Sequence, residues 1–206
     1  MISATPPICL TVAILLSTAD FAAAAKHFNW TFEDDAANTI PRGFHEEVGR
    51  WRVVEAEGRK VLAQKAESPD KVFNVVLGTV SNPTNIDLSV DLKTVAGKLD
   101  QGGGLIWRAA DKNNYYVARY NPLEDNFRVY KVERGKRTMF KNADIIHTPG
   151  WHKLRVTMQG KHIECFYDGK KYLECDDETF PAGGMIGLWT KADAQSYFAD
   201  LELTAR

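Results

Sequence analysis

Two arginines end apolar segments of the chain at positions from which they can reach a polar ligand. Arg108 follows the apolar segment 104–107, and Arg119 follows the apolar segment 115–118. A guanidinium holds several N–H donors in a fixed plane, which suits hydroxyl, carbonyl and carboxylate oxygens. Three further polar side chains are expected beside them on neighbouring strands: Tyr115, Arg128 and Tyr130. We expect these residues to line one polar face, the alternative being that each simply faces solvent.

Trp189 offers an aromatic ring to the same face. It precedes a polar loop that contains Lys191 and Asp193, so its flat apolar ring and its N–H are placed to stack on a sugar ring. The alternative for Trp189 is burial in the core. Trp107 follows two apolar residues and is expected in the core.

The acidic segment 174–178 carries the spacing E-x-D-x-E. On a strand, Glu174, Asp176 and Glu178 project from one face, and a retaining glycoside hydrolase needs two carboxyl groups about 5 Å apart. However, Pro181 follows closely and ends a strand. We therefore expect an acidic strand edge that runs into a loop, and we identify no catalytic residue.

The histidines do not have the spacing of a metal site. The five are scattered along the chain: His27, His45, His147, His152 and His162. The glycine-rich segment 102–104 precedes an apolar strand rather than a helix, so it is not expected to hold phosphate. The residue pattern predicts no metal and no cofactor.

Short strands must position these side chains. Apolar residues alternate with polar ones over 86–92 and 153–158, which is the pattern of strands with one buried face. Further strands are expected at 51–56, 60–64, 72–78, 103–109, 114–120, 127–133, 162–167 and 171–175, with Gly, Pro and Asn turns between them. No window shows helical periodicity. Regular short strands joined by hairpins predict an all-β sandwich or barrel.

The first 25 residues are typical of an export signal. An apolar run at 8–16 precedes three alanines at 23–25 that offer a cleavage site. The usual basic residues before the run are missing, and the run is too short for a transmembrane helix. We expect residues 1–25 to be a signal peptide, residues 26–206 to form one domain, and the protein to be secreted or periplasmic without a membrane span.

The charge of the chain argues against nucleic acid and anionic membranes as partners. It has 26 Lys and Arg against 27 Asp and Glu, which is a net charge of −1. Neither sign gathers into a stripe or run, as nucleic-acid-binding proteins require. The oligomeric state leaves no signal in the sequence.

Cys165 and Cys175 flank Asp168-Gly169, a favoured two-residue hairpin turn. With that turn, Cys165 faces Tyr172, and Cys175 points to the opposite side of the sheet. A three-residue turn puts both thiols on one face, but diagonally, where the spacing is long for a bridge. Only a longer loop or a bulge pairs them directly, so we expect two free thiols rather than a disulfide.

Several short motifs follow one another along nearly the whole chain after residue 25. They are FNWTFE at 28–33, GRWRV at 49–53, GGLIWR at 103–108, YYVAR at 115–119, WHKLRV at 151–156, YDG at 167–169 and GLWTKAD at 187–193. In this order they resemble bacterial secreted domains of the 3-keto-disaccharide hydrolase family and, more loosely, laminin G-like and family-16 glucanase sandwiches.

The resemblance implies a fold and a place for the ligand. The fold is a concanavalin A-like jelly-roll β-sandwich of two antiparallel sheets, in which the first and last strands lie side by side. The ligand site lies on the concave face of one sheet. Related sandwiches hold calcium with loop acids, which leaves calcium as an alternative at four residues: Asp34, Asp35, Asp193 and Asp200.

These expectations define three functions to distinguish. The first is a saccharide-recognition domain for glucosides or polysaccharide ends, with the arginines, Tyr130 and Trp189 on the concave face. The second, implied by the resemblance, is a 3-keto-glucoside lyase or hydratase, or a glycoside hydrolase. In the lyase, Arg108 or Arg119 stabilises an oxyanion while an unidentified base removes a proton. The third is a structural or adhesion module of the cell envelope.

Overall fold

The computed structural model describes residues 1, 24–80 and 82–206, and within that part of the chain every regular element is a β-strand. With no helix there, none of the described residues belongs to a helix that could span a membrane. The predicted signal peptide falls largely on residues 2–23, which lie outside the described residues. The all-β prediction is confirmed.

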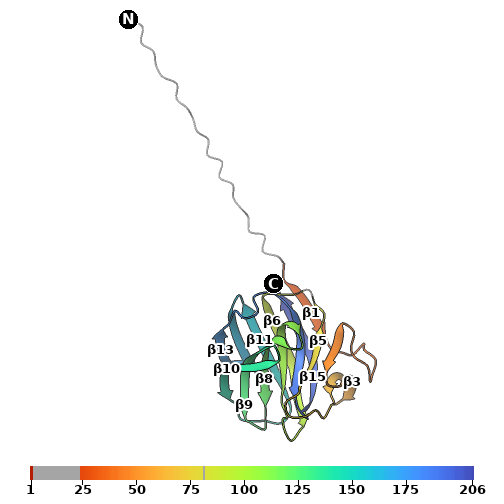
Figure 1. Cartoon of the computed structure of the whole chain (residues 1–206). Helices are drawn as coiled ribbons and strands as arrows, with labels where there is room; N and C mark the ends of the chain where they lie inside the picture. The colour runs from red at the N-terminus through yellow and green to blue at the C-terminus, as the bar shows by residue number, and fades with distance from the viewer. Residues whose placement is uncertain (2–23, 81) are drawn as a thin grey trace.

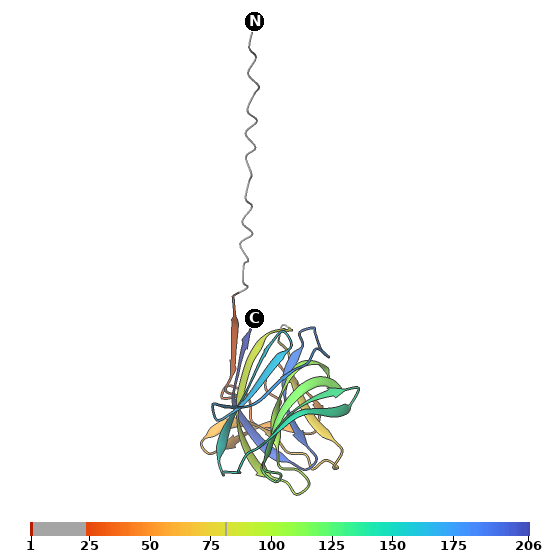
Figure 2. The same cartoon turned by 90° about the vertical axis from the view of Figure 1, so that its left-hand side faces the viewer.

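The strands form two antiparallel sheets, which Figures 1 and 2 show from two sides. Sheet A consists of β1 (Lys26–Trp30), β3 (Trp51–Ala56), β4 (Arg59–Gln64), β6 (Ile86–Ala96), β11 (Trp151–Gln159), β12 (His162–Tyr167), β13 (Lys170–Asp176) and β15 (Gln195–Ala205). Sheet B consists of β2 (Phe44–Val48), β5 (Phe73–Gly78), β7 (Gly103–Asp111), β8 (Asn114–Asn121), β9 (Asn126–Glu133), β10 (Lys136–Asp144) and β14 (Met185–Lys191).

The strand order within each sheet differs from the order in sequence. Sheet A runs β13-β12-β11-β6-β15-β4-β3, with β1 also paired to β15, and sheet B runs β10-β9-β8-β7-β14-β5-β2. The first strand therefore lies beside the last, with Phe28 opposite Leu203 (Figure 1). The resemblance implied this pairing of the first and last strands.

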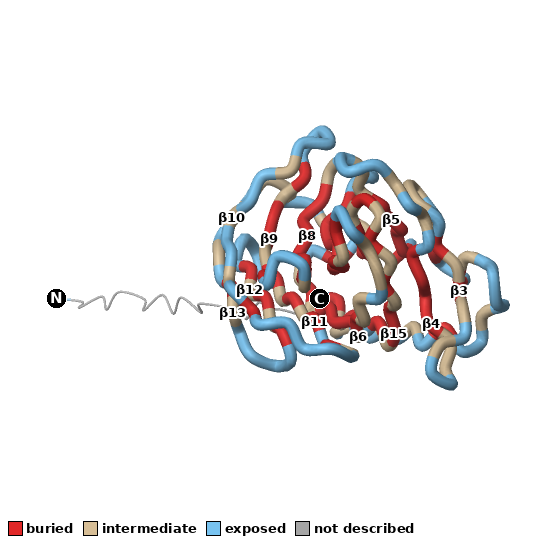
Figure 3. Tube along the Cα trace, turned by 90° about the horizontal axis from the view of Figure 1, so that it is seen from below, coloured by how far each residue is buried: buried red, intermediate tan, exposed pale blue. Residues whose placement is uncertain are grey.

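The main core fills the space between the two sheets. The alternation predicted for β6 holds, because Leu88, Val90 and Leu92 are fully buried while Asp87 and Asp91 face outward. Trp107 is also fully buried in this core, as expected. Burying one such aliphatic side chain contributes about 1.5–3 kcal/mol. Figure 3 shows the buried residues running along β4, β5 and β8, with exposed residues in the loops.

The β12–β13 hairpin decides the state of the two cysteines. Asp168 and Gly169 have φ values of 48° and 78°, as a two-residue type I′ turn requires. A bulge after Cys165 then shifts the register, so that Cys165 lies opposite Leu173 and not opposite Tyr172. The bulge brings Cys175 to the same face but one pair further along, and both thiols are free. The expectation of free thiols is confirmed, although the bulge that was considered as a way to pair them is present.

Sheet B curls so strongly that its outer face is concave. Strands β10 and β5 are five interstrand steps apart, which is about 24 Å in a flat sheet. Yet the Cζ atom of Arg137 on β10 lies 5.3 Å from the ring centroid of Phe73 on β5. Two side chains cannot bridge that distance across a flat sheet. We call this outward side of sheet B the concave face.

Candidate ligand-binding face

Three of the predicted site residues lie in one row across the concave face. Trp189 on β14 is opposite Gly104 on β7, which is opposite Arg119 on β8, which is opposite Arg128 on β9. Directly paired residues of an antiparallel ladder project from the same face. Tyr130 follows Arg128 by two residues, and strand alternation places it on that face as well.

Aromatic side chains make the floor of the concave face. Trp189 and Tyr115 are both fully buried, and the Trp189 Nε1–H donates to the Tyr115 hydroxyl over 3.1 Å. Burial raises the pKa of Tyr115 far above its usual value, so its hydroxyl keeps its proton. The Phe73 ring packs 5.4 Å from the Trp189 ring. Trp189 is therefore a floor residue, covered by other side chains, rather than an open stacking surface.

Arg137 lies over this aromatic floor. Its Cζ atom is 4.4 Å from the ring centroid of Tyr130, 5.3 Å from that of Phe73 and 5.7 Å from that of Trp189. A guanidinium within about 6 Å of an aromatic face is attracted by the ring quadrupole. Burial lowers the pKa of Arg137, since the charge loses part of its hydration. Three rings thus hold one half-buried cation at the centre of the face.

A buried ion pair occupies one end of the face. Arg119 is 1% exposed, and its Nη2 donates to Asp100 Oδ2 and to Glu124 Oε2 over 3.2 and 3.3 Å. Its Nη1 donates to Asn126 Oδ1 over 2.9 Å. Arg128 joins from the next strand, with 2.8 Å between its Nη1 and Glu124 Oε2. Both predicted arginines of this end are therefore paired with acids.

The Glu124 carboxylate at this end stays ionised. Burial acts to raise the pKa of Glu124, but the hydrogen bond from Asn126 and the charges of Arg119 and Arg128 outweigh it and hold the pKa below its usual value. Asp100 Oδ1 also accepts from the backbone N–H of Gly102 over 2.8 Å. Three carboxylate oxygens on this side, Asp100 Oδ1, Asp100 Oδ2 and Glu124 Oε2, are thus engaged by donors of the protein.

A turn of the backbone holds Asp100 in place. Asp193, between β14 and β15, accepts the backbone N–H groups of Lys98, Leu99 and Asp100 over 2.7, 3.0 and 3.1 Å. Gly97 has φ 147°, and a Cβ there would come within 1.8 Å of the Asp100 carbonyl oxygen. Only glycine fits this tight turn. Asp193 and Gly97 therefore position the acid that pairs with Arg119.

The concave face also gathers buried polar atoms that have no hydrogen-bond partner. Among the described residues, five buried side-chain atoms lack one. Four belong to strands β8, β9 and β10 and to this face: Arg119 Nε, Asn121 Nδ2, Tyr130 Oη and Arg137 Nη1. Buried polar groups are almost always paired in folded proteins, so such a cluster calls for a ligand or ordered water.

Arg108 does not lie on the concave face. A bulge in β7 after Trp107 gives Arg108 a φ of 47° and directs its side chain to the end of the sandwich. There it donates to the carbonyl oxygens of Thr84, Gly160 and Phe180 over 2.6–3.0 Å. Arg108 lines a cavity of about 570 Å³ and ties three loops together. The structure thus separates it from the other predicted site residues.

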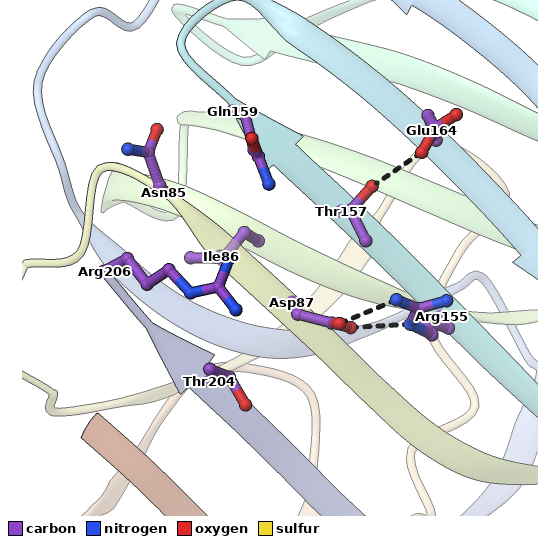
Figure 4. A pocket seen from close by; sticks show the side chains of 9 residues that line it. All are labelled: Asn85, Ile86, Asp87, Arg155, Thr157, Gln159, Glu164, Thr204 and Arg206. Atoms are coloured by element: carbon purple, nitrogen blue, oxygen red, sulfur yellow. Dashed lines mark hydrogen bonds and ion pairs between the residues drawn. The ribbon is translucent and has the colours of Figure 1, made fainter. Parts of the chain in front are cut away.

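A second cavity, of about 300 Å³, lies on the outward side of sheet A and is drawn in Figure 4. Its side chains pair with one another across β6, β11 and β12. Arg155 donates twice to Asp87 over 2.7 Å, and Thr157 donates to Glu164 over 3.3 Å (Figure 4). Arg155 is paired with Asp87, and Glu164 with Lys171, so we do not assign the ligand to this cavity.

The E-x-D-x-E segment is an acidic strand edge. Strand β13 is the last strand of sheet A, and Glu178 lies beyond its end, lining the cavity beside Arg108. Glu174 joins Glu164 and His162 in a group whose ligand atoms lie within 4.8 Å of one another. However, the Lys171 ammonium bridges the two glutamates over 2.7 and 2.6 Å. The place of a cation is thus already taken by lysine.

Three of the four acids considered for calcium serve other contacts. Asp35 binds Arg42, Asp200 binds Arg59, and Asp193 accepts backbone N–H groups. Asp34 is exposed. Among the described residues, none of these four belongs to a group of metal ligands.

Two contributors to the concave face were missed from the sequence. Arg137 lies on β10, where six of the nine residues are polar and the three apolar ones do not alternate with them. Asp100 lies in a loop. The Arg134-Gly135 turn was a usable signal, because a two-residue hairpin turn after β9 implies a returning strand on which Arg137 pairs with Val132.

Comparison with known proteins supports the fold. No family model and no curated protein sequence matches the chain. The carbohydrate-binding module CBM66 from Bacillus subtilis is similar in structure, with a TM-score of 0.67 and 18% identity over 79% of this chain and 96% of that chain. The β-glucanase from Bacillus licheniformis has a TM-score of 0.61 and 12% identity over 87% of this chain and 98% of that chain.

A third solved structure matches only in part of its length. The GH43 protein BlXynB from Bacillus licheniformis has a TM-score of 0.63 and 14% identity over 86% of this chain, which spans 39% of that protein. At such low identity these similarities establish the architecture alone. The chain is a jelly-roll β-sandwich of the concanavalin A-like type, as the sequence predicted.

Proposed function

We propose that this protein is a carbohydrate-binding β-sandwich domain whose ligand lies on the concave face of sheet B. The observation that carries the proposal is the group of four unpartnered polar atoms beside an aromatic floor. A saccharide offers oxygens to hydrogen-bond donors and a C–H face to an aromatic ring such as that of Phe73, which is only partly buried. The names of the similar structures, a carbohydrate-binding module, a β-glucanase and a GH43 protein, support the same class of ligand.

The electrostatics of the face favour binding over turnover. A 3-keto-glucoside lyase needs a base, and a glycoside hydrolase needs a carboxyl group with a raised pKa. The two carboxylates of the Arg119 network are paired with that arginine, and the pKa of Glu124 is lowered. A carboxylate held this way is a weak base, so we propose recognition of a sugar rather than its conversion.

The proposed site of action is outside the cytoplasm. Residues 1–25 have the apolar run and the three alanines of an export signal, which supports the proposal. The mass of the protein purified from its natural host tests it, because removal of the signal predicts a chain that begins at Lys26. A chain that keeps Met1 contradicts export by cleavage.

Saturation-transfer NMR with a panel of glucosides and oligosaccharides tests the binding proposal. We expect transfer to at least one sugar, and a weaker signal in Tyr130→Phe, which removes one unpartnered hydroxyl and little else. Tyr197→Phe is the matched control, because Tyr197 lies on β15 of sheet A. A response to Tyr197→Phe but not to Tyr130→Phe would move the site away from the concave face.

New product peaks would change the class of function. If the peaks appear with 3-keto sugars, the protein is a lyase or hydratase. No transfer and no turnover across the panel would contradict both proposals and leave a structural module of the cell envelope.

A further inference from the structure

The proposed carbohydrate ligand leaves open which kind of sugar the concave face selects. We infer that this ligand carries a carboxylate, as uronic-acid sugars do, and that the guanidinium of Arg137 binds it. This inference rests on the proposed function and specifies its substrate class. It follows from the geometry of Arg137, from the charge of the face and from the kind of atoms that lack partners.

The Arg137 guanidinium packs against three aromatic rings, and its buried Nη1 atom has no hydrogen-bond partner. Tyr130, Phe73 and Trp189 hold the group through their rings, with 4.4 Å from Cζ to the nearest centroid. A guanidinium donates its hydrogen bonds within its own plane, along its edges. None of its nitrogens donates a hydrogen bond to, or lies within ion-pair distance of, any of the described residues. The rings therefore orient the cation without using its donors.

Arg137 differs in this respect from the other arginines of the face. Arg119 and Arg128 both pair with Glu124, and Arg119 also pairs with Asp100. Asp100 and Glu124 are thus paired with Arg119 and Arg128. Together with Arg137, these four residues carry a net charge of +1. A half-buried cation without a counter-ion is unfavourable. A bound carboxylate would supply that counter-ion.

The unpartnered atoms point to the same chemistry. Arg119 Nε, Asn121 Nδ2 and Arg137 Nη1 can only donate, and Tyr130 Oη can donate or accept. A neutral sugar hydroxyl brings a donor with each acceptor, whereas a carboxylate brings two oxygens that only accept. A face with an excess of donors is therefore matched best by a ligand with an excess of acceptors.

The Arg137 guanidinium has the shape to bind a carboxylate with two parallel hydrogen bonds. Such charge-assisted pairs are roughly twice as strong as neutral hydrogen bonds. Arginine also keeps its charge at any physiological pH.

The test compares one sugar in two forms with the full-length protein as it is purified. Methyl glucuronide and methyl galacturonide are titrated beside their methyl esters, which keep the shape and remove the charge. We expect each acid that binds to do so at least about tenfold more tightly than its ester, the equivalent of about 1.4 kcal/mol. Equal affinity of acid and ester in the unaltered protein would overturn the inference, and this result needs no variant.

Variants then test whether Arg137 causes the preference for the acid over its ester. In Arg137→Gln the ratio between acid and ester should fall below about twofold, and Arg137→Lys should restore part of it through its charge. Arg155→Gln, on the outward side of sheet A, is the matched control and should keep the ratio. An acid preference that survives in a folded Arg137→Gln protein would overturn the assignment to Arg137.

The two proposals fail in different ways. If neutral sugars bind, and Tyr130→Phe weakens them, but acids gain nothing over esters, then the carboxylate inference is wrong and the proposed function stands. If neither acids, esters nor neutral sugars bind, then both are wrong.

Discussion

The two outward faces of the sandwich use charge in opposite ways. On sheet A, Arg155 pairs with Asp87 over 2.7 Å and Lys153 with Asp91 over 3.0 Å, in side chains that are exposed to solvent. On the concave face of sheet B, Arg137 has aromatic neighbours and no acid within ion-pair distance among the described residues. These charged side chains of sheet A pair with one another, whereas the concave face keeps hydrogen-bond donors without partners in the protein.

The difference follows from the curvature of the sheets. A flat or convex face exposes its side chains to water, which hydrates every charge and makes each ion pair weak. A concave face brings side chains from distant strands together and removes water from between them. Uncompensated charge is tolerated on the concave face only if it serves a purpose, and we take ligand binding to be that purpose.

The largest expected effect contrasts an aromatic residue from each face. Trp189→Ala removes a fully buried ring from the concave floor and should lower the free energy of unfolding by about 3–5 kcal/mol. Phe166→Ala removes a half-buried ring from the outward side of sheet A, and we expect less than half of that loss. Urea denaturation followed by fluorescence measures both. Equal losses would mean that the two faces are packed alike.

The next effect contrasts the buried and exposed ion pairs. Arg119→Met leaves Asp100, which is 1% exposed, without its cation and should cost about 3–5 kcal/mol. Arg155→Met breaks a pair whose side chains are 41% and 42% exposed and should cost less than about 1 kcal/mol. Denaturant midpoints at equal slope decide between them. A costly Arg155→Met would show that sheet A depends on its surface charges.

The stability of the concave face should depend on pH through Glu124. The pKa of Glu124 is lowered in the folded protein, so Glu124 stabilises the fold above its unfolded pKa of about 4.3 and loses that contribution as the pH falls through the lower folded value. Glu124→Gln should therefore lose less stability than the unaltered protein as the solution is acidified from about pH 5 to pH 3. Unfolding at each pH provides the measurement, and identical curves would contradict it.

Glu164 on sheet A is compared with Glu124, because its pKa is also lowered. The hydrogen bond from Lys171 is the main cause of its lowered pKa, and this pair is exposed to solvent. In about 1 M salt, where charges are screened beyond about 3 Å, the acid effect of Glu164→Gln should largely disappear. The effect of Glu124→Gln should persist because its partners are partly buried. Loss of both effects in salt would mean that the concave network is no better shielded.

The smallest expected effect is that of Arg137 on stability. Arg137→Met loses the attraction of three rings but also removes a poorly compensated cation, so the free energy of unfolding should change by less than about 1 kcal/mol. Thermal and urea unfolding test this in the absence of sugar. A loss above about 2 kcal/mol would mean that Arg137 mainly braces the sheet, and its role as a ligand residue would need another argument.

The local structure and much of the core follow from patterns along the chain. Period-two alternation over 86–92 identified β6 and its buried face, and the Asp168-Gly169 turn identified the β12–β13 hairpin. The sequence also placed Arg119, Arg128 and Tyr130 together, because they lie on the two adjacent strands of one hairpin. Such features depend on neighbours in the chain, which is why pattern and turn chemistry predict them.

The contacts and the burial of those residues depend on the packing of the whole fold. The curl of sheet B brings Arg137 from β10 over Phe73 on β5, and no pattern within either strand encodes that distance. A single bulge turns Arg108 away from the concave face, and the curl buries Trp189 beneath other side chains. Curvature, bulges and burial arise from the packing of all strands at once, whereas strand and turn signals are local.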